Sequence, residues 1–139
     1  MTPASSAPEA RPSKLIYASH ALVGPDSTEM LAICRASLRR NARLGVSGAL
    51  YFDGRFFFQV LEGARAALEG LFELIRRDRR HRGVIPLGMA TIPARRFATS
   101  PMRFVDGRRL PELSRDFPMA RLQTGCREAA ARIEAALAP

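Results

Sequence analysis

The sequence of 139 residues has no tryptophan, two cysteines and two histidines. Cys34 and Cys126 lie far apart, and Cys34 falls within a helical pattern, which favours buried reduced thiols over a disulfide framework. The cysteines and the histidines, His20 and His81, show no spacing that is typical of a metal site. The sequence therefore predicts neither a disulfide scaffold nor a metalloprotein.

Long apolar segments are missing as well, so the sequence predicts no membrane span. Residues 1–13 are rich in proline, alanine and serine and lack the apolar run of a secretory signal. We expect these residues to form a disordered lead-in to a single domain, and we expect a cytoplasmic location.

Enzyme motifs are also missing. The chain has no G-x-S-x-G, no P-loop, no G-x-G-x-x-G and no pair of acids set for general acid–base catalysis. Ser19 and His20 are adjacent on a predicted strand, so their side chains point to opposite faces. No residues suggest a substrate cleft beside a bound cofactor. We therefore predict that the chain is not an enzyme.

Positive charge is what the chain has in excess, with 22 Lys and Arg against 13 acids and a net charge of +9. Arginines cluster within residues 35–43 and 76–82. A single arginine usually lies on a solvated helix end, but a cluster can hold a nucleotide phosphate, an acidic partner or nucleic acid. Aromatic residues are not interleaved with these arginines, which makes nucleic acid the less favoured partner.

Hydrophobic periodicity predicts the element order β-α-β-β-α-β-β. Asp26, followed by Glu29, is the expected cap of the first helix. This order matches an α+β, ferredoxin-like sheet with two helices on one face and one added strand. The predicted elements are strand 15–19, helix 26–40, hairpin 45–61, helix 68–77, strand 83–92 and strand 101–105.

An aspartate and a glycine at 53–54 predict a two-residue hairpin turn, in which Phe52 pairs with Arg55. Gln59 would then lie opposite Gly48, among apolar neighbours and beside free space. Because an unpaired buried amide costs about 1–3 kcal/mol, we expect a polar group to meet it.

Tyr17, Asn41 and Gln59 are the polar side chains that we expect to converge, in a groove beneath the two helices. A flat heterocycle would suit them, since its edge carries donors and acceptors while its faces pack on aliphatic groups. Taken singly, each has an ordinary explanation, as a core tyrosine, a turn residue and a solvent-facing strand residue.

Residues 108–139 differ from the rest and are predicted to form a C-terminal helical extension. Thr124 is the expected cap of an alanine-rich helix in which Ile133 and Leu137 share one apolar face. Such a helix packs on the open side of the sheet or against another subunit.

Several spaced motifs resemble the BLUF family of flavin-binding blue-light sensors, over about residues 14–107. They are LIYAS with Tyr17, RASLRRNARLGVSGAL with Asn41, FFFQVLEG with Gln59, RRDRRHRGV, and RRFATSPMRFV with Met102. The family's ferredoxin-like fold agrees with the predicted element order.

The resemblance implies roles for individual residues. Tyr17 would be the redox-active tyrosine. Gln59 would be the switch that lies between the Tyr17 hydroxyl and the flavin, and Met102 would be a neighbour of Gln59. Ser100 stands where many members carry tryptophan, so the coupling of Gln59 to the fifth strand is less certain.

The resemblance also implies a binding site for flavin, with FAD first and FMN or riboflavin as alternatives. Asn41, Arg80 and His81 would bind the ring. It further implies a homo-oligomer, an unidentified downstream protein partner and no membrane, with residues 108–139 as the transmitter. The alternative is a photochemically inactive ferredoxin-like module that binds a protein partner or nucleic acid.

Overall fold

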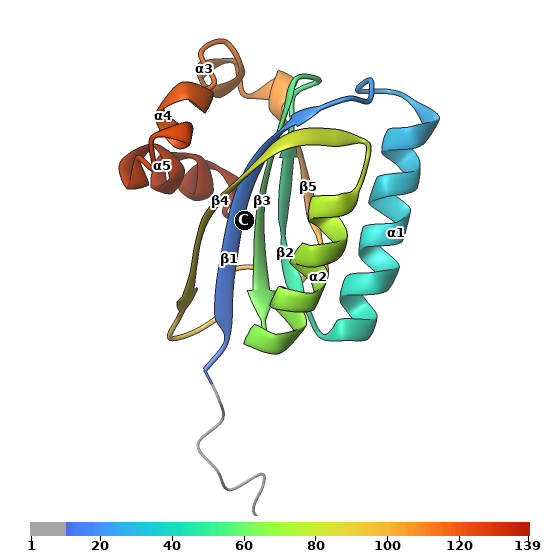
Figure 1. Cartoon of the computed structure of the whole chain (residues 1–139), viewed down its shortest axis with the longest axis vertical. Helices are drawn as coiled ribbons and strands as arrows, with labels where there is room; N and C mark the ends of the chain where they lie inside the picture. Colours follow the sequence, from blue (N-terminus) through green and yellow to red (C-terminus); the bar gives the residue numbers. More distant parts are fainter. Residues whose placement is uncertain (1–10) are drawn as a thin grey trace, which may run out of the picture.

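The computed structural model describes residues 11–139 as one mixed sheet with helices on both faces (Figure 1). Residues 1–10 of the expected lead-in lie outside the described residues, and Ser13 already belongs to a strand. The strands are β1 (Ser13–Ala21), β2 (Ser47–Phe52), β3 (Phe56–Gly63), β4 (His81–Thr91) and β5 (Arg103–Asp106). The helices are α1 (Thr28–Leu44), α2 (Arg65–Arg77), α3 (Pro111–Ser114), α4 (Met119–Gln123) and α5 (Arg127–Leu137), with a 3-10 turn at Gly107–Arg109.

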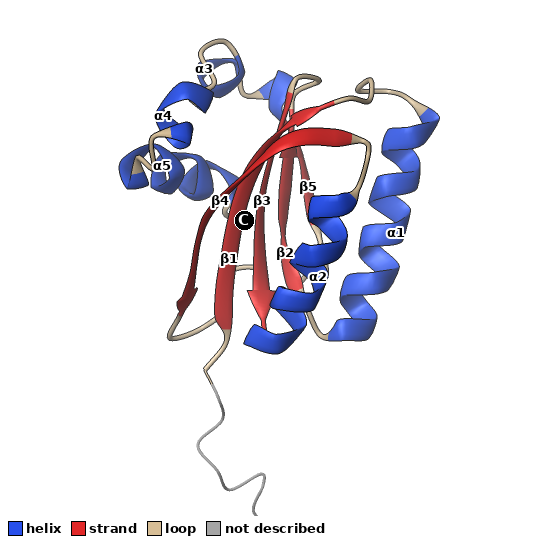
Figure 2. Cartoon of the chain, viewed as in Figure 1, coloured by secondary structure: helices blue, strands red, loops and turns tan. Residues whose placement is uncertain are grey.

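The sheet has the strand order β4-β1-β3-β2-β5, and only β5 runs parallel to its neighbour. Helices α1 and α2 cover one face, while α3, α4 and α5 lie on the other (Figure 2). The predicted ferredoxin-like fold, with both helices on one face and a C-terminal helical extension, is therefore confirmed. Pro86 lies on the edge strand β4 where its pairing with β1 is irregular, as expected for proline in a sheet.

Two apolar layers follow from the alternation of side chains along the central strand β3. Phe57 and Leu61 pack with α1 and α2, and Phe58 and Val60 pack with the C-terminal helices. Gln59 shares the face of Phe57 and Leu61, so the alternation brings this amide to the layer beneath α1 and α2.

Helix α1 begins and ends at other residues than the sequence predicts. Ser27, not Asp26, is its cap, because the Ser27 hydroxyl accepts a hydrogen bond from the Met30 amide. The helix also continues past residue 40 to Leu44 and ends at Gly45, whose φ of 66° lies in the left-handed region. Asn41 therefore lies in the last turns of a helix and not at the entry to a hairpin.

The predicted hairpin register is wrong by two residues. Phe52 pairs with Phe57, because the Asp53 carboxylate accepts hydrogen bonds from the amides of Arg55 and Phe56 and thereby lengthens the turn. Gln59 consequently lies opposite Leu50 instead of the predicted glycine.

Three smaller predictions also change. Strand β4 begins at His81 and β5 at Arg103, each two residues from the expected start. Thr124 ends α4, while Cys126 is the residue at the start of α5. Cys34 and Cys126 are free but only half-buried, so the expectation of buried thiols is wrong in degree.

Gly48 is required by the close approach of β2 and β3. A Cβ atom at this position would lie 2.0 Å from the Val60 carbonyl oxygen, which is backbone and cannot move aside.

We predict that Gly48→Ala lowers the free energy of unfolding by about 1–3 kcal/mol or more. Gly70→Ala is the matched control, since its Cβ would meet nothing within 4 Å in helix α2, and it should stabilise by about 0.4–1 kcal/mol. Urea unfolding of both variants measures these changes in the free energy of unfolding. Equal values for the two variants would contradict the close approach of β2 and β3 at Gly48.

Candidate functional site

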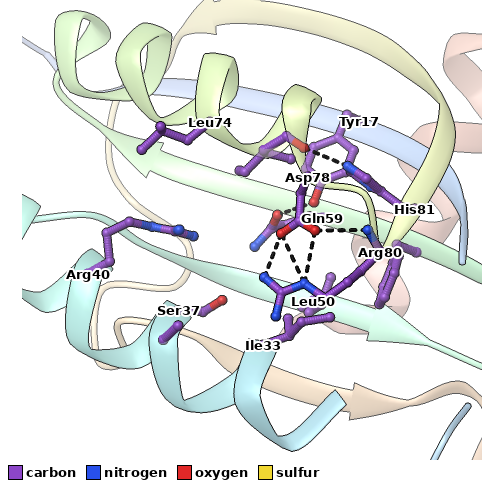
Figure 3. A pocket seen from close by; sticks show the side chains of 13 residues that line it. Tyr17, Ile33, Ser37, Arg40, Leu50, Gln59, Leu74, Asp78, Arg80 and His81 are labelled. Carbon is purple, nitrogen blue, oxygen red and sulfur yellow. Dashed lines mark hydrogen bonds and ion pairs between the residues drawn. The ribbon is translucent and has the colours of Figure 1, made fainter. Parts of the chain in front are cut away.

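A pocket lies between α1, α2 and the sheet (Figure 3). Helix α1, helix α2, the internal strands and the start of β4 all contribute to its wall. The lining residues are Tyr17, Ile33, Ala36, Ser37, Arg40, Leu50, Phe57, Gln59, Leu74, Ile75, Asp78, Arg80 and His81.

The floor of the pocket holds a short hydrogen bond between two paired strands. Tyr17 on β1 lies opposite Gln59 on β3, and its hydroxyl donates to the Gln59 Oε1 atom at 2.5 Å. The other end of the amide faces β5, where Nε2 lies 3.6 Å from the Met102 sulfur. A thioether can only accept a hydrogen bond, so the amide is oriented with its NH₂ group toward Met102 and its oxygen toward the phenol.

The Tyr17 side chain is buried, with 4% of its surface exposed. Its ring lies 5.9 Å from that of Phe72 and 6.1 Å from that of His81, measured between ring centroids. Burial raises the pKa of the phenol well above its usual value. Tyr17 is therefore neutral at ordinary pH and remains a hydrogen-bond donor to Gln59.

His81 is fixed by hydrogen bonds from both ring nitrogens. Nε2 lies 2.6 Å from the carbonyl oxygen of Ile75, and Nδ1 lies 2.8 Å from the hydroxyl of Ser19. Because a carbonyl only accepts, Nε2 carries a proton, and in the neutral ring Nδ1 accepts from the serine. The imidazole thus links the end of α2 to β1 with a fixed orientation at the pocket wall.

Asp78 and Arg80 form an ion pair at one side of the pocket, with Nη2 and Oδ2 2.6 Å apart (Figure 3). The Asp78 carboxylate also accepts a hydrogen bond from the Arg80 backbone amide at 2.9 Å. The guanidinium, mainly through its hydrogen bonds, lowers the pKa of Asp78. The pair is half-buried and holds the Arg80 side chain beside the pocket.

Two buried side-chain polar atoms of α1 have no hydrogen-bond partner among the described residues, and one of them belongs to a residue that lines the pocket. One is Nε of Arg40, and burial lowers the pKa of this guanidinium. The other is Oδ1 of Asn41, whose Nδ2 donates to the Pro101 carbonyl oxygen at 3.1 Å. Leaving a buried donor and a buried acceptor unpaired costs free energy, which a polar ligand would recover.

The predicted site residues do not all share one wall. Tyr17, Gln59, Arg80 and His81 line the pocket. Asn41 is fully buried and is not among the lining residues, and Met102 lies beyond Gln59.

The sequence analysis missed Arg40, Ser37 and Asp78 as lining residues. For the first two there was a signal, because they follow Ile33 at helical spacing and so interrupt the apolar face of α1 with polar groups. No sequence signal marked Asp78, since its position depends on the turn that joins α2 to β4.

The fold and the pocket together define a ferredoxin-like domain with a binding site for a small ligand that has polar edges. Within residues 11–139, no cluster of side chains is suited to a metal ion. The same residues contain no helix whose length and apolarity would suffice to cross a membrane.

Residues 13–103 match the model of the family described as BLUF, sensors of blue-light using FAD. The chain belongs to the BLUF family, and it is a flavin-binding blue-light photoreceptor domain. The resemblance noted from the motifs is thereby confirmed.

Individual relatives support this assignment. The chain is 34% identical over 92 residues to the blue light- and temperature-regulated antirepressor BluF of Escherichia coli, covering 66% of this chain and 23% of that protein. It is 37% identical over 83 residues to the photoactivated adenylate cyclase subunit beta of Euglena longa, covering 60% of this chain and 10% of that protein. The chain thus spans a quarter or less of the length of these curated relatives.

Solved structures resemble the whole fold. A dark-state structure of BlrB, a BLUF protein, has a TM-score of 0.75 at 34% identity and covers 92% of this chain and 98% of its own. BlrP1 of Klebsiella pneumoniae, in a manganese and cyclic-diGMP complex, has a TM-score of 0.65 at 35% identity, and the match covers 81% of this chain and 32% of the BlrP1 chain.

The burial of the phenols predicts an alkaline limit to stability. Tyr17 and Tyr51 are the two tyrosines of the chain, and burial raises the pKa of each. The folded state therefore favours the neutral phenol, and this stabilisation is complete below the unfolded pKa of about 10 and is lost as pH rises above it. We expect tyrosinate absorbance to appear only together with loss of far-UV circular dichroism.

Tyr17→Phe should halve the amplitude of that titration, because only Tyr51 remains. A tyrosine that ionises near pH 10 in a protein with intact secondary structure would contradict the burial.

Proposed function

We propose that Tyr17 and Gln59 are the photoactive pair of this blue-light sensor and that its flavin is FAD, with FMN or riboflavin as alternatives. The observation that carries the proposal is the 2.5 Å hydrogen bond from the Tyr17 hydroxyl to Gln59 Oε1 at the floor of the pocket. Two further features support it: the phenol is buried, and the amide reaches Met102 with its other end.

The residues present fit a flavin. Its ring edge carries both donors and acceptors, which suit the unpartnered Arg40 Nε and Asn41 Oδ1, while Ile33 and Leu50 offer apolar surface. Asn41, Arg80 and His81 are the proposed binding residues, and Arg40 joins them on the evidence of its unpaired nitrogen. Flavin, when bound, supplies the absorption of blue light and an excited state that accepts an electron.

Tyr17 is positioned to give an electron to a bound, light-excited flavin and, along its hydrogen bond, a proton toward Gln59 Oε1, and both would return to the phenol when the charges recombine. Gln59 responds by rotating its amide or by becoming the imidic tautomer, which exchanges donor and acceptor ends. Rotation replaces the contact between Nε2 and the Met102 sulfur by one from an oxygen, which a thioether cannot satisfy. The change at Gln59 therefore alters how β3 holds Met102.

The proposed output passes to residues 108–139, with residues 14–107 as the sensor domain. Light would shift the population of contacts that the C-terminal helices make, either within a homo-oligomer or with a downstream protein partner. One relative is named as an antirepressor and another as an adenylate cyclase subunit. These names support a downstream partner that acts in light-regulated signalling. We place this signalling in the cytoplasm, without membrane or nucleic-acid binding.

The first test is the visible absorption spectrum of the flavin-loaded protein before and after blue light. We expect a flavin band that shifts reversibly to the red, because a stronger hydrogen bond to the ring stabilises its excited state. Flavin-reconstituted protein without a band, or without a shift, would leave the photochemically inactive binding module as the better interpretation.

The second test concerns the photoactive pair. Gln59→Leu removes the switchable amide and Tyr17→Phe removes the hydroxyl, so each variant should bind flavin and lose the usual red shift. Light-minus-dark difference spectra measure this loss.

Both variants have matched controls within the chain. Gln123→Leu changes an exposed glutamine on α4, and Tyr51→Phe changes a tyrosine whose hydroxyl donates to Asp53 on the other face of the sheet. Both controls should keep the wild-type shift. A normal shift in Gln59→Leu or a wild-type photocycle in Tyr17→Phe would remove that residue from its role.

A further inference from the structure

Residues 96–102, in the connection between β4 and β5, form a segment that we call the strap. The strap runs from one face of the sheet to the other. Phe97 is 1% exposed and belongs to the apolar cluster of the C-terminal helices, whereas Met102 belongs to the cluster beneath α1 and α2. The strap thus contacts both the pocket side and the side where α5 is docked.

Strand β3 holds both ends of the strap through side chains on its opposite faces. Gln59 contacts Met102 at one end. Glu62, three positions later, accepts hydrogen bonds from the backbone amides of Arg96 and Phe97, each at 2.8 Å. An odd spacing along a strand places the two side chains on opposite faces, so a single strand can hold the strap on both sides of the sheet.

Glu62 is 1% exposed, and its carboxylate is satisfied almost wholly by the strap. Besides the two amides, it accepts from the Ser47 hydroxyl at 3.3 Å, and that hydroxyl in turn accepts from Arg95 Nη1 at 3.2 Å. A buried charge without such donors would be costly, so Glu62 and the strap amides depend on each other.

The middle of the strap is fixed by further hydrogen bonds. The Ser100 hydroxyl accepts from the Met102 amide at 3.2 Å, and the Ser100 carbonyl accepts from the Gly48 amide at 3.4 Å. Asn41 donates to the Pro101 carbonyl. With these contacts the segment is a connected element and not a loose loop, so a displacement at one end is felt at the other.

Helix α5 is attached to the strap and to the residue that follows it. The α5 carboxylate of Glu134, 7% exposed, binds Lys14 on β1 at 3.1 Å and lies 3.8 Å from Arg96. Arg103, next to Met102, donates from Nε to the carbonyl oxygen of Leu137 at the end of α5, at 3.1 Å. Lys14 ties the helix to the sheet itself, while Arg96 and Arg103 tie it to the ends of the strap.

We propose that the strap transmits the state of Gln59 to α5 and that Glu62 is the positioning residue that makes this transmission possible. The inference rests on the proposed function of Gln59, which it extends by naming the path. A change at Gln59 moves Met102, the strap moves as a unit because Glu62 anchors its other end, and Phe97, Arg96 and Arg103 change their contacts with α5.

The test is amide hydrogen exchange of the flavin-loaded full chain in the dark and under blue light, recorded with the absorption spectrum. Wild-type protein should show faster exchange in residues 127–137 under light. Glu62→Gln keeps the shape but offers one acceptor oxygen for two amides, so exchange at residues 96 and 97 should be about tenfold faster in the dark. Its red shift should remain, while the light-dependent change in residues 127–137 should be lost.

Glu69→Gln is the matched control, because Glu69 is an exposed carboxylate on α2 whose removal should leave spectrum and exchange unchanged. If Glu62→Gln does not fold, Phe97→Leu tests the same proposal, because it reduces the contact of the strap with the C-terminal helices and leaves Glu62 in place. This variant should also lose the light-dependent change in residues 127–137. A wild-type light response of α5 in either variant overturns the proposal.

The absorption spectrum reports the state of Gln59, and amide exchange in residues 127–137 reports the contacts of α5. Wild-type protein with a red shift but no light-dependent exchange in residues 127–137 overturns the strap and leaves the sensor intact. Wild-type protein without a red shift overturns the proposed function of Gln59 and, with it, the strap.

Discussion

The pairing of β1 with β3 is the constraint on which the site depends. It places Tyr17 directly opposite Gln59, and the two side chains share the face that α1 and α2 cover. A phenol and an amide that are both at least 96% buried must satisfy each other, because water is excluded. Met102 then accepts one of the two N–H donors of the amide. The β1–β3 register thus determines the hydrogen-bond chain from the phenol to β5.

The central part of this arrangement was predictable because it depends on periodicity. The predicted hairpin register was wrong by two residues, yet a shift of two keeps every side chain on its face. Gln59 therefore faces the groove as expected, although its neighbour is Leu50 and not Gly48. A shift of one residue would have turned Gln59 toward the C-terminal helices. The prediction that was wrong is the two-residue turn, because the Asp53 carboxylate accepts hydrogen bonds from two backbone amides and lengthens the connection.

Other features could not be predicted because they depend on contacts between distant segments. The position of Asn41 is an exception, because α1 continues to a left-handed Gly45, and a glycine is a local signal for the end of a helix that the sequence analysis did not use. The pairing of Glu62 with the amides at 96 and 97 joins residues more than thirty positions apart. In sequence Glu62 is simply an acid at the end of an apolar strand, so only the fold shows that it is buried.

Glu62 and Glu134, two buried carboxylates on the face of the sheet that the C-terminal helices cover, differ in what stabilises them. The difference determines which contacts can change. Glu134 is neutralised mainly by Lys14, through a charge pair that tolerates small displacements. Glu62 accepts two directional backbone hydrogen bonds, which weaken steeply when donor and acceptor are misaligned. A small movement of the strap therefore affects Glu62 more than Glu134. The sheet can keep α5 docked through Lys14 while the strap contacts of the helix respond to Gln59.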